Sequence, residues 1–213
     1  MEFSRDFIEQ LAATPARGWV FNPYAGDDAR SRSRRHNLSL YLQLMYARRP
    51  SLLLVGEAPG YRGCRVTGVP FTSEAILLSH SPPFGLFGPS AGFQNCGEHD
   101  KPLREATATI LWESLVELAV IPLLWNAFPL HPHQPGRPAS NRPPGKIELN
   151  VGRVFISELL AMFSIQRVIA VGNKATTALH DWGIPASKVR HPGHGGKVAF
   201  RQQLESIIWQ GLR

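Results

Sequence analysis

Short apolar runs alternate along this sequence with longer amphipathic stretches. Runs rich in apolar residues predict buried parallel strands at 52–55, 120–125 and 166–171, and a fourth, poorer strand is predicted at 186–190. Apolar residues recur every three or four positions in the stretches between and after them, which predicts helices at 103–119, 146–163, 173–182 and 198–209. In the second of these helices, the side chains expected to face the core are Ile147, Val151, Val154, Phe155, Leu159 and Met162. This alternation predicts an α/β fold, an α/β/α sandwich in which helices cover both faces of a central four-stranded parallel sheet.

The chain shows no internal repeat and no sign of a second domain. We therefore expect one domain at 1–213, with a helical and basic N-terminal segment at 1–50 before a core at 51–213. Further amphipathic spacing predicts shorter helices at 3–13, 37–49 and 73–79. Residues 14–36 and 81–102 are punctuated by proline and glycine, which predicts an irregular stretch and a surface excursion respectively.

The composition is that of a globular protein, because 43% of the 213 residues are hydrophobic and 18% are charged. No apolar run approaches the roughly 18 residues of a membrane span, and the first residues lack the features of a signal peptide. We therefore expect a monomer in the cytoplasm, associated with the nucleoid in a bacterium, with no membrane partner. Cys64 and Cys96 are expected to be unpaired thiols, and no cofactor is predicted.

The net charge of +7 is carried mostly by arginine and favours a polyanionic partner, nucleic acid before an anionic membrane surface. Arginine suits phosphate because its planar guanidinium donates two hydrogen bonds at once. A basic run at 30–35 is either a solvated loop or an arm that contacts phosphates. If it is an arm, the residues expected to bind DNA are Arg32, Arg34 and Arg35.

Polar residues follow three of the four predicted strands, and these residues are Glu57, Asn126 and His191. The carboxyl ends of parallel strands meet at one edge of a sheet, where open α/β folds bind their ligands. Each residue alone is ordinary, but around one crevice they resemble a site. The glycine turn at 56–60 and the nearby Phe71 indicate a pocket for a flat molecule.

Three motifs at these strand ends resemble those of the uracil-DNA glycosylase superfamily. They are GEAPG with GVPF at 56–60 and 68–71, LLWNAFPLHP at 123–132, and HPG at 191–193. The first motif is similar to that of the branch called family 4. The resemblance implies a monofunctional DNA glycosylase of base excision repair. Such an enzyme flips out a deaminated base, most often uracil, and hydrolyses its N-glycosidic bond.

The resemblance also implies a role for each matching residue. Glu57 would position the attacking water or stabilise the sugar cation, and His191 would stabilise the leaving base, which makes both catalytic. Phe71 would stack on the extruded base and Asn126 would read its imide edge, with the backbone of the first motif completing the base-binding set: Gly56, Ala58, Phe71 and Asn126. The loop after His191 would enter the DNA minor groove, through Gly193, His194, Gly195 and Lys197.

The chain departs from family 4 in several places. Residues 61–65 replace the usual acidic residues after the first motif, and the cysteines of an iron–sulfur cluster are missing, so neither a cluster nor any other metal is predicted. Gly193 stands where a serine is usual. Gly60 stands where the strictest uracil enzymes carry a tyrosine that excludes the thymine methyl, which leaves a hypoxanthine- or xanthine-directed glycosylase as an alternative.

Three other classes of function are weighed against this one. A metal hydrolase would draw its ligands from His131, His133, His191, His194 and a cysteine, but no carboxylate partner is evident. A nucleotide-binding protein lacks both glycine-rich phosphate motifs. The more serious rival is a non-catalytic member of the same superfamily that binds DNA or a modified base, and the presence of both Glu57 and His191 argues against it.

Overall fold

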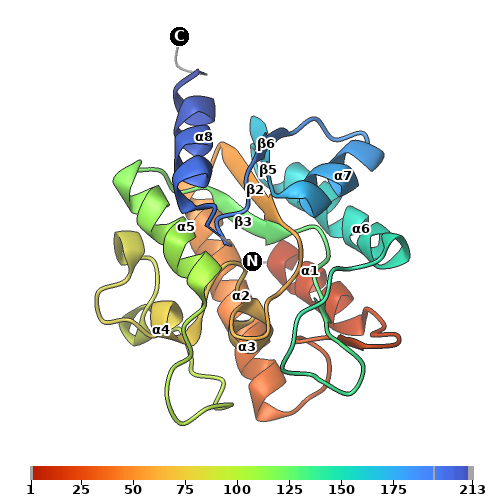
Figure 1. The fold of residues 1–213 in the computed structure, drawn as a ribbon. Coiled ribbons are helices and arrows are strands. Elements are labelled where there is room, and N and C mark those ends of the chain that lie inside the picture. Colours follow the sequence, from red (N-terminus) through yellow and green to blue (C-terminus); the bar gives the residue numbers. More distant parts are fainter. Residues whose placement is uncertain (1, 194, 211–213) are drawn as a thin grey trace.

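The computed structural model describes residues 2–193 and 195–210, and its centre is a parallel sheet (Figure 1). The sheet has four strands, in the spatial order β3 (Leu123–Asn126), β2 (Leu52–Gly56), β5 (Arg167–Val171) and β6 (Ser187–Val189). Leu54 of β2 pairs with Leu124 on one side and Ile169 on the other. The predicted α/β fold with a four-stranded parallel sheet is therefore confirmed.

Six longer helices surround the sheet in the described part of the chain: α1 (Glu2–Ala13), α2 (Ala29–Arg48), α5 (Ala106–Glu117), α6 (Lys146–Met162), α7 (Asn173–Asp181) and α8 (Lys197–Gln210). Helices α2, α5 and α8 lie on one side of the sheet, and α1, α6 and α7 lie on the other (Figure 1). Phe7 of α1 packs edge-on against Trp125 of β3 and Phe155 of α6, with ring centroids 5.2 and 5.5 Å away. The arrangement is the predicted three-layer sandwich.

Short elements complete the chain: α3 (Cys64–Thr67), α4 (Glu74–Leu77), the 3-10 helices η1 (Pro83–Gly85) and η2 (Pro89–Ala91), and the strands β1 (Val20–Phe21) and β4 (His131–Pro132). β1 and β4 pair antiparallel in a small separate ribbon. This ribbon ties the N-terminal segment to the loop after β3, and the sequence did not predict it, because strands of two residues carry no periodicity.

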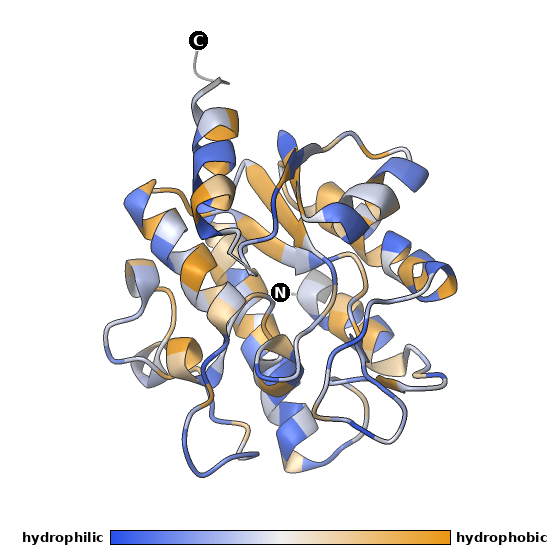
Figure 2. Ribbon diagram, viewed as in Figure 1, coloured by the Kyte–Doolittle hydropathy of each residue, from blue (hydrophilic) through white to orange (hydrophobic). Residues whose placement is uncertain are grey.

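The apolar residues concentrate in the sheet and on the inner faces of its helices (Figure 2). Every residue of β2 and β3 is buried, as expected for central parallel strands covered on both faces. The N-terminal segment contributes to the same buried cluster, through Phe7, Leu11, Leu38, Tyr41, Leu42 and Met45. No helix among the described residues is long and apolar enough to cross a membrane.

Helix α2 begins earlier than the sequence predicts. Asp28 is its N-cap, and its carboxylate accepts hydrogen bonds from the backbone N–H groups of Arg30 (2.9 Å) and Ser31 (3.1 Å). The prediction of an irregular stretch is therefore wrong for residues 29–36. An N-cap aspartate satisfies backbone donors at a helix start, and arginine is a good helix former, so both local signals were present.

The buried face of α6 also differs from the prediction. Ile147, Val151 and Val154 were expected to face the core, but they are 84%, 36% and 42% exposed. Gly152 explains the difference, since a Cβ built there would lie only 1.6 Å from the carbonyl oxygen of Ala127. The helix therefore packs its glycine directly on the backbone after β3, and this contact selects the buried face.

The segment at 81–102, which was predicted to be a surface excursion, also packs its side chains against the core. Phe87 packs against Trp112 of α5 with ring centroids 5.2 Å apart, and Phe93 packs against Phe87 at 5.4 Å. Glu98 forms ion pairs with Arg34 of α2 and Arg65 of α3. These contacts attach the excursion to the core on the side of the sheet that carries α2 and α5.

Candidate active site

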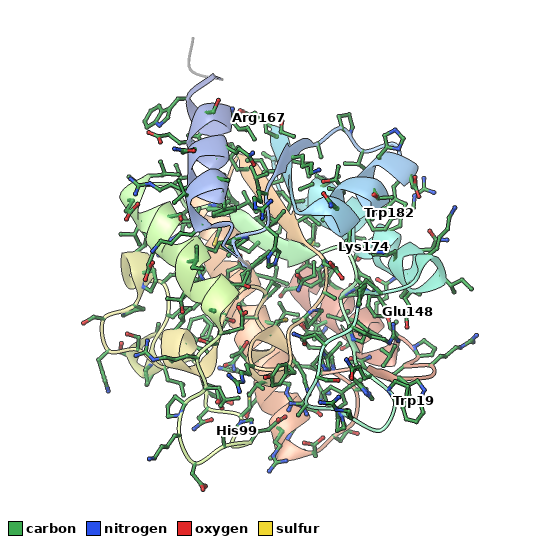
Figure 3. All side chains as sticks on the ribbon, in the orientation of Figure 1. Trp19, His99, Glu148, Arg167, Lys174 and Trp182 are labelled. Atoms are coloured by element: carbon green, nitrogen blue, oxygen red, sulfur yellow. The ribbon has the colours of Figure 1, made fainter. Side chains whose placement is uncertain are left out.

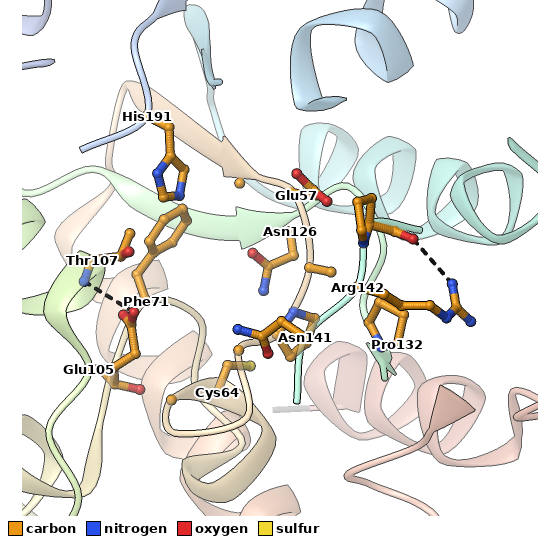
Figure 4. Close-up of a pocket in the computed structure, with 17 residues that line it drawn as sticks. Glu57, Cys64, Phe71, Glu105, Thr107, Asn126, Pro132, Asn141, Arg142 and His191 are labelled. Carbon is orange, nitrogen blue, oxygen red and sulfur yellow. Dashed lines mark hydrogen bonds between the residues drawn. The ribbon is translucent and has the colours of Figure 1, made fainter. Parts of the chain in front are cut away.

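The carboxyl ends of β2, β3 and β6 border one cavity of about 410 Å³ (Figure 4). Its size lies in the range of roughly 300–1,000 Å³ that is usual for ligand sites. Glu57 directly follows β2, Asn126 ends β3, and His191 lies two residues after β6. All three line the cavity, together with the other predicted base-binding residues, Gly56, Ala58 and Phe71. The structure thus brings together the residues that the strand-end argument selected.

The ring of Phe71 lies directly against Gly56. A Cβ built on Gly56 would lie 2.4 Å from Cζ of Phe71 and 2.8 Å from Oδ1 of Asn126. Glycine at position 56 therefore allows the aromatic wall and the amide to stand side by side. Phe71 has φ 51°, in the left-handed region that aromatic residues seldom adopt. Its carbonyl accepts a hydrogen bond from Nε1 of Trp112 (2.9 Å), which helps to hold this strained conformation.

Asn126 presents an unused amide to the cavity. The residue is only 5% exposed. Its side chain makes no hydrogen bond to any residue that the structure describes, and it lines the cavity (Figure 4). A buried polar group without a partner is costly, so such a group in a cavity is suited to a polar ligand. The amide offers one acceptor and one donor to that ligand.

Glu57 is half-buried at the cavity wall, and burial raises the pKa of its carboxyl group above the ordinary value. Lys174 opposes this shift, because its positive charge favours the carboxylate and lowers the pKa. Lys174 lies in the first turn of α7, just after β5 (Figure 3). Lys174 follows β5, the remaining strand of the sheet, as the other site residues follow theirs, so its position was accessible from the sequence.

His191 is oriented by the glycines that follow it. The backbone N–H of Gly193 donates a hydrogen bond to Nδ1 of His191 (3.0 Å), so in the neutral ring Nε2 carries the proton. A Cβ on Gly196 would lie 2.0 Å from the carbonyl oxygen of His191, so a larger residue cannot fit there without a backbone shift. The tight turn thus fixes the tautomer of the neutral His191 ring, with the proton on Nε2.

The cavity is also lined by residues that the sequence did not single out, among them Glu105, Thr107, Asn141 and Arg142. Asn141 accepts a hydrogen bond at Oδ1 from the backbone N–H of Tyr61 (2.9 Å), which joins the loop after β4 to the loop after β2. Arg142 pairs with Glu148 of α6, and Glu105 caps α5. Loop residues such as Asn141 and Arg142 follow no periodic pattern, so the sequence offers no signal for them beyond a proline-rich stretch.

The predicted DNA-binding loop after His191 is described except for His194, which lies outside the described residues. Gly193 packs beside the His191 ring, and Gly195 is exposed. Lys197 begins α8 and its Nζ lies 2.7 Å from Oε2 of Glu113. Nothing in these contacts tests insertion into DNA, which stays a prediction.

The basic run at 30–35 is part of helix α2 rather than a loop or a free arm. Arg34 is 2% exposed and forms an ion pair with Glu98, so the prediction that it binds DNA is wrong. Arg35 donates to the carbonyl oxygens of Tyr24 and Gly26, and Arg32 donates to the carbonyl of Asp27. The guanidinium groups of Arg32, Arg34 and Arg35 are thus engaged by the protein itself.

The metal-hydrolase alternative finds no support in the described part of the chain, where no three His, Cys, Asp or Glu side chains are grouped as metal ligands. His131 is fully buried, and its Nδ1 donates a hydrogen bond to the carbonyl of Pro59 (2.7 Å). Burial lowers the pKa of His131 to about 4. His131 therefore supports the turn that carries Glu57 and is neutral at pH 7.

We expect this histidine to make the fold sensitive to acid. The pKa of His131 is lowered on folding, so its contribution to stability is complete above the ordinary value of about 6.5 and is lost as the pH falls to about 4. The loss amounts to about 3 kcal/mol of unfolding free energy. Urea unfolding at pH 7 and at pH 4.5 measures it, and His131→Gln should lose less stability between these values than the wild type.

The exposed His180 on α7 provides the control, because His180→Gln should keep the full acid sensitivity of the wild type. Equal losses of stability in the wild type and His131→Gln would show that other groups cause the acid sensitivity.

No family model matches the chain, and none of the curated proteins matches it. Among solved structures, the chain is similar to wild-type SMUG2 from Pedobacter heparinus, with a TM-score of 0.63 and 14% sequence identity. The similarity covers 99% of this chain and 97% of that one. At this identity the likeness shows a shared fold, and it extends over the N-terminal segment as well as the sheet.

Proposed function

We propose that this protein is a DNA glycosylase that extrudes a deaminated base from DNA and hydrolyses its N-glycosidic bond, with uracil as the first choice. The unpartnered amide of Asn126 carries the proposal, because a nearly buried amide beside an aromatic ring in a cavity suits the edge of a flat base. The fold supports it, since SMUG2 belongs to the uracil-DNA glycosylase superfamily.

The oxygen and the nitrogen of the Asn126 amide match the hydrogen-bonding pattern of uracil. Its oxygen accepts from N3–H and its nitrogen donates to O4, whereas cytosine presents the reverse pattern at these atoms. A mismatch at this nearly buried amide leaves polar groups unpaired, and the cost of these unpaired groups discriminates strongly between the two bases. The ring of Phe71 adds stacking of about 1–3 kcal/mol, which offsets part of the cost of extruding the base.

Glu57 and His191 are placed for the two charges that develop when the glycosidic bond breaks. The sugar becomes positive and the base becomes negative, so a carboxylate is needed near the first and a donor near the second. Glu57 supplies the carboxylate, which also orients a water molecule for attack on the sugar. His191 supplies the donor at Nε2, because Gly193 occupies Nδ1.

The decisive experiment incubates the purified protein with single- and double-stranded oligonucleotides that contain uracil, hypoxanthine or xanthine. Treatment with alkali then cleaves any abasic site. We expect cleavage of the uracil strands after alkali and none without it. The absence of cleavage with every base would reject the glycosylase and favour a protein that binds DNA without cutting the glycosidic bond.

A glycosylase directed at hypoxanthine or xanthine is the second candidate, and the geometry of Gly60 favours it. A Cβ built on Gly60 has no atom within 4 Å, so the cavity is open at this position. An open wall accommodates bases larger than uracil.

We expect Gly60→Tyr to narrow the cavity and to restrict the range of bases. Removal of hypoxanthine should fall about 10- to 100-fold relative to removal of uracil, since a steric wall discriminates by this order. Single-turnover rates on the two substrates measure the ratio. Gly60→Ala is the control, and it should change the ratio less. An equal effect of Gly60→Tyr on both bases would show that position 60 does not select the base.

Lys174→Met should move the acid limb of the pH–rate profile to higher pH. Glu57 must be ionised to act, so the rate falls as the pH drops through its raised pKa. Removing the Lys174 charge removes the effect that lowers this pKa, and protonation then begins at higher pH. Single-turnover rates between pH 4 and 8 measure the limb. Lys146→Met, at the exposed start of α6, should leave the limb in place. An unmoved limb in Lys174→Met would show that another group controls it.

A further inference from the structure

Two grooves adjoin the cavity and have no lining residue in common. The first, called here the Arg62 groove, has a volume of about 580 Å³ and shares Gly60, Glu105 and Asn141 with the cavity. The second, called the Arg190 groove, has a volume of about 660 Å³ and shares Glu57 and His191 with it. The grooves therefore leave the cavity from different parts of its wall.

The Arg62 groove offers two guanidinium groups that have no carboxylate partner among the described residues. Arg62 and Arg104 line it and make no ion pair with any described residue. The carboxylates of this groove are engaged elsewhere, because Glu105 accepts from two backbone N–H groups of α5 and Glu113 pairs with Lys197. Positive charge is thus available to a ligand.

An aromatic ring accompanies these charges. The guanidinium of Arg62 lies over the ring of Tyr61, 5.2 Å from its centroid. Tyr61 is held in place by its backbone N–H, which donates to Asn141. A tyrosine at the edge of the cavity is suited to stack on an unpaired base, and arginine is suited to the adjoining phosphate.

The Arg190 groove is basic as well. Lys188 and Arg190 line it, both are exposed, and neither forms an ion pair with a described residue. The backbone N–H of Arg190 donates to Oε1 of Gln203 (2.6 Å), which fixes the chain between β6 and the cavity. The carboxylate that lines this groove is Glu57, which already faces the cavity.

We propose that one strand of nucleic acid crosses the mouth of the cavity from one groove to the other. Arg62 and Arg104 would hold the phosphates on one side of the extruded nucleotide, and Lys188 and Arg190 would hold those on the other. This inference rests on the proposed function for the nucleotide in the cavity. It also replaces the basic run of α2 as the phosphate-binding surface, since the guanidinium groups of Arg34 and Arg35 are engaged within the protein.

Binding of short single strands tests the proposal without any turnover. The probes contain one tetrahydrofuran abasic analogue, which cannot be cleaved, and extend from it on the 5′ side, the 3′ side or both. The double variants Arg62→Gln/Arg104→Gln and Lys188→Gln/Arg190→Gln neutralise one groove each. Each should lose about 10-fold in affinity for strands that extend to its own side, and little for strands that extend only to the other.

The salt dependence gives a second readout. Each double variant should lower the slope of log K against log salt concentration by about 1.4 on fully extended strands, because two phosphate contacts are lost at about 0.7 each. Arg153→Gln, on the exposed side of α6, is the control and should leave both readouts unchanged. Circular dichroism confirms that the variants fold.

The proposal is wrong if both double variants weaken binding equally on both sides, or if neither weakens it. Its failure is distinct from failure of the proposed function. A wild-type protein that removes uracil but shows no side-specific loss would contradict the grooves alone. A wild-type protein that removes no base but shows the side-specific losses would retain the grooves and contradict the glycosylase.

Discussion

Glu57→Gln should lower the rate of base release about 100- to 1,000-fold, because removal of one group that stabilises transition-state charge has effects of this order. Glutamine keeps the size of the side chain but cannot carry the negative charge that the developing sugar cation requires. The half-buried position of Glu57 strengthens this charge effect, since less solvent screens it. Single-turnover release of uracil from a single-stranded oligonucleotide measures the loss.

Measuring the affinity of the same variant for DNA shows whether the substitution affects the chemical step or the recognition of the strand. Glu57→Gln should bind the tetrahydrofuran strand as the wild type does, and His191→Ala should also lose turnover while it keeps this binding. Glu158→Gln on α6, outside the cavity, makes the same chemical change and should leave the rate unaltered. A Glu57→Gln protein with wild-type turnover would remove Glu57 from the mechanism.

Asn126→Asp should lower uracil removal by about 100-fold or more and should reduce the preference for uracil over cytosine. The carboxylate accepts hydrogen bonds but does not donate to O4 of uracil. Two hydrogen-bond acceptors, a carboxylate oxygen and O4, would then face each other and repel. Cytosine presents an amino donor at the same place, which a carboxylate accepts. Single-turnover rates on matched uracil and cytosine strands measure the change of preference.

The control for this variant is Asn150→Asp, an equal change of charge on the exposed side of α6. It should leave both rates as they are in the wild type. Because Asn126 is nearly buried, thermal unfolding of Asn126→Asp must show that the protein still folds at the assay temperature. An unaltered preference for uracil in a folded variant would show that Asn126 does not read the base.

The strands of the sheet and the longer helices could be predicted from the spacing of apolar residues along the sequence. The four strands and the longer helices after them were predicted within a few residues, because burial on both faces requires continuous apolar runs and burial on one face requires helical spacing. The buried face of helix α6 could not be predicted in this way. Ile147 and Val151 satisfy the apolar spacing, yet Gly152 packs on the backbone of Ala127 and turns them toward solvent.

The basic run of α2 shows a second limit. A cluster of arginines has the same local sequence whether its side chains are solvated or buried. The carboxylate that pairs with a buried arginine can lie far away in the chain, so the local sequence does not show it. The partner of Arg34 is Glu98, 64 residues further along the chain, and only tertiary packing brings the two together. The sequence-based DNA-binding role of Arg34 was therefore wrong for a physical reason that no local pattern reveals.

The sequence by itself determined the sheet and the position of Glu57, Asn126 and His191 at its edge, because parallel strands that end in polar residues must bring those residues together. Tertiary structure alone decided what surrounds them. It placed Asn141 in the cavity wall, and it left Arg62 and Arg190 without a carboxylate partner in the adjoining grooves. These features come from loops and helix ends whose positions depend on packing between distant segments, and periodicity does not encode such packing.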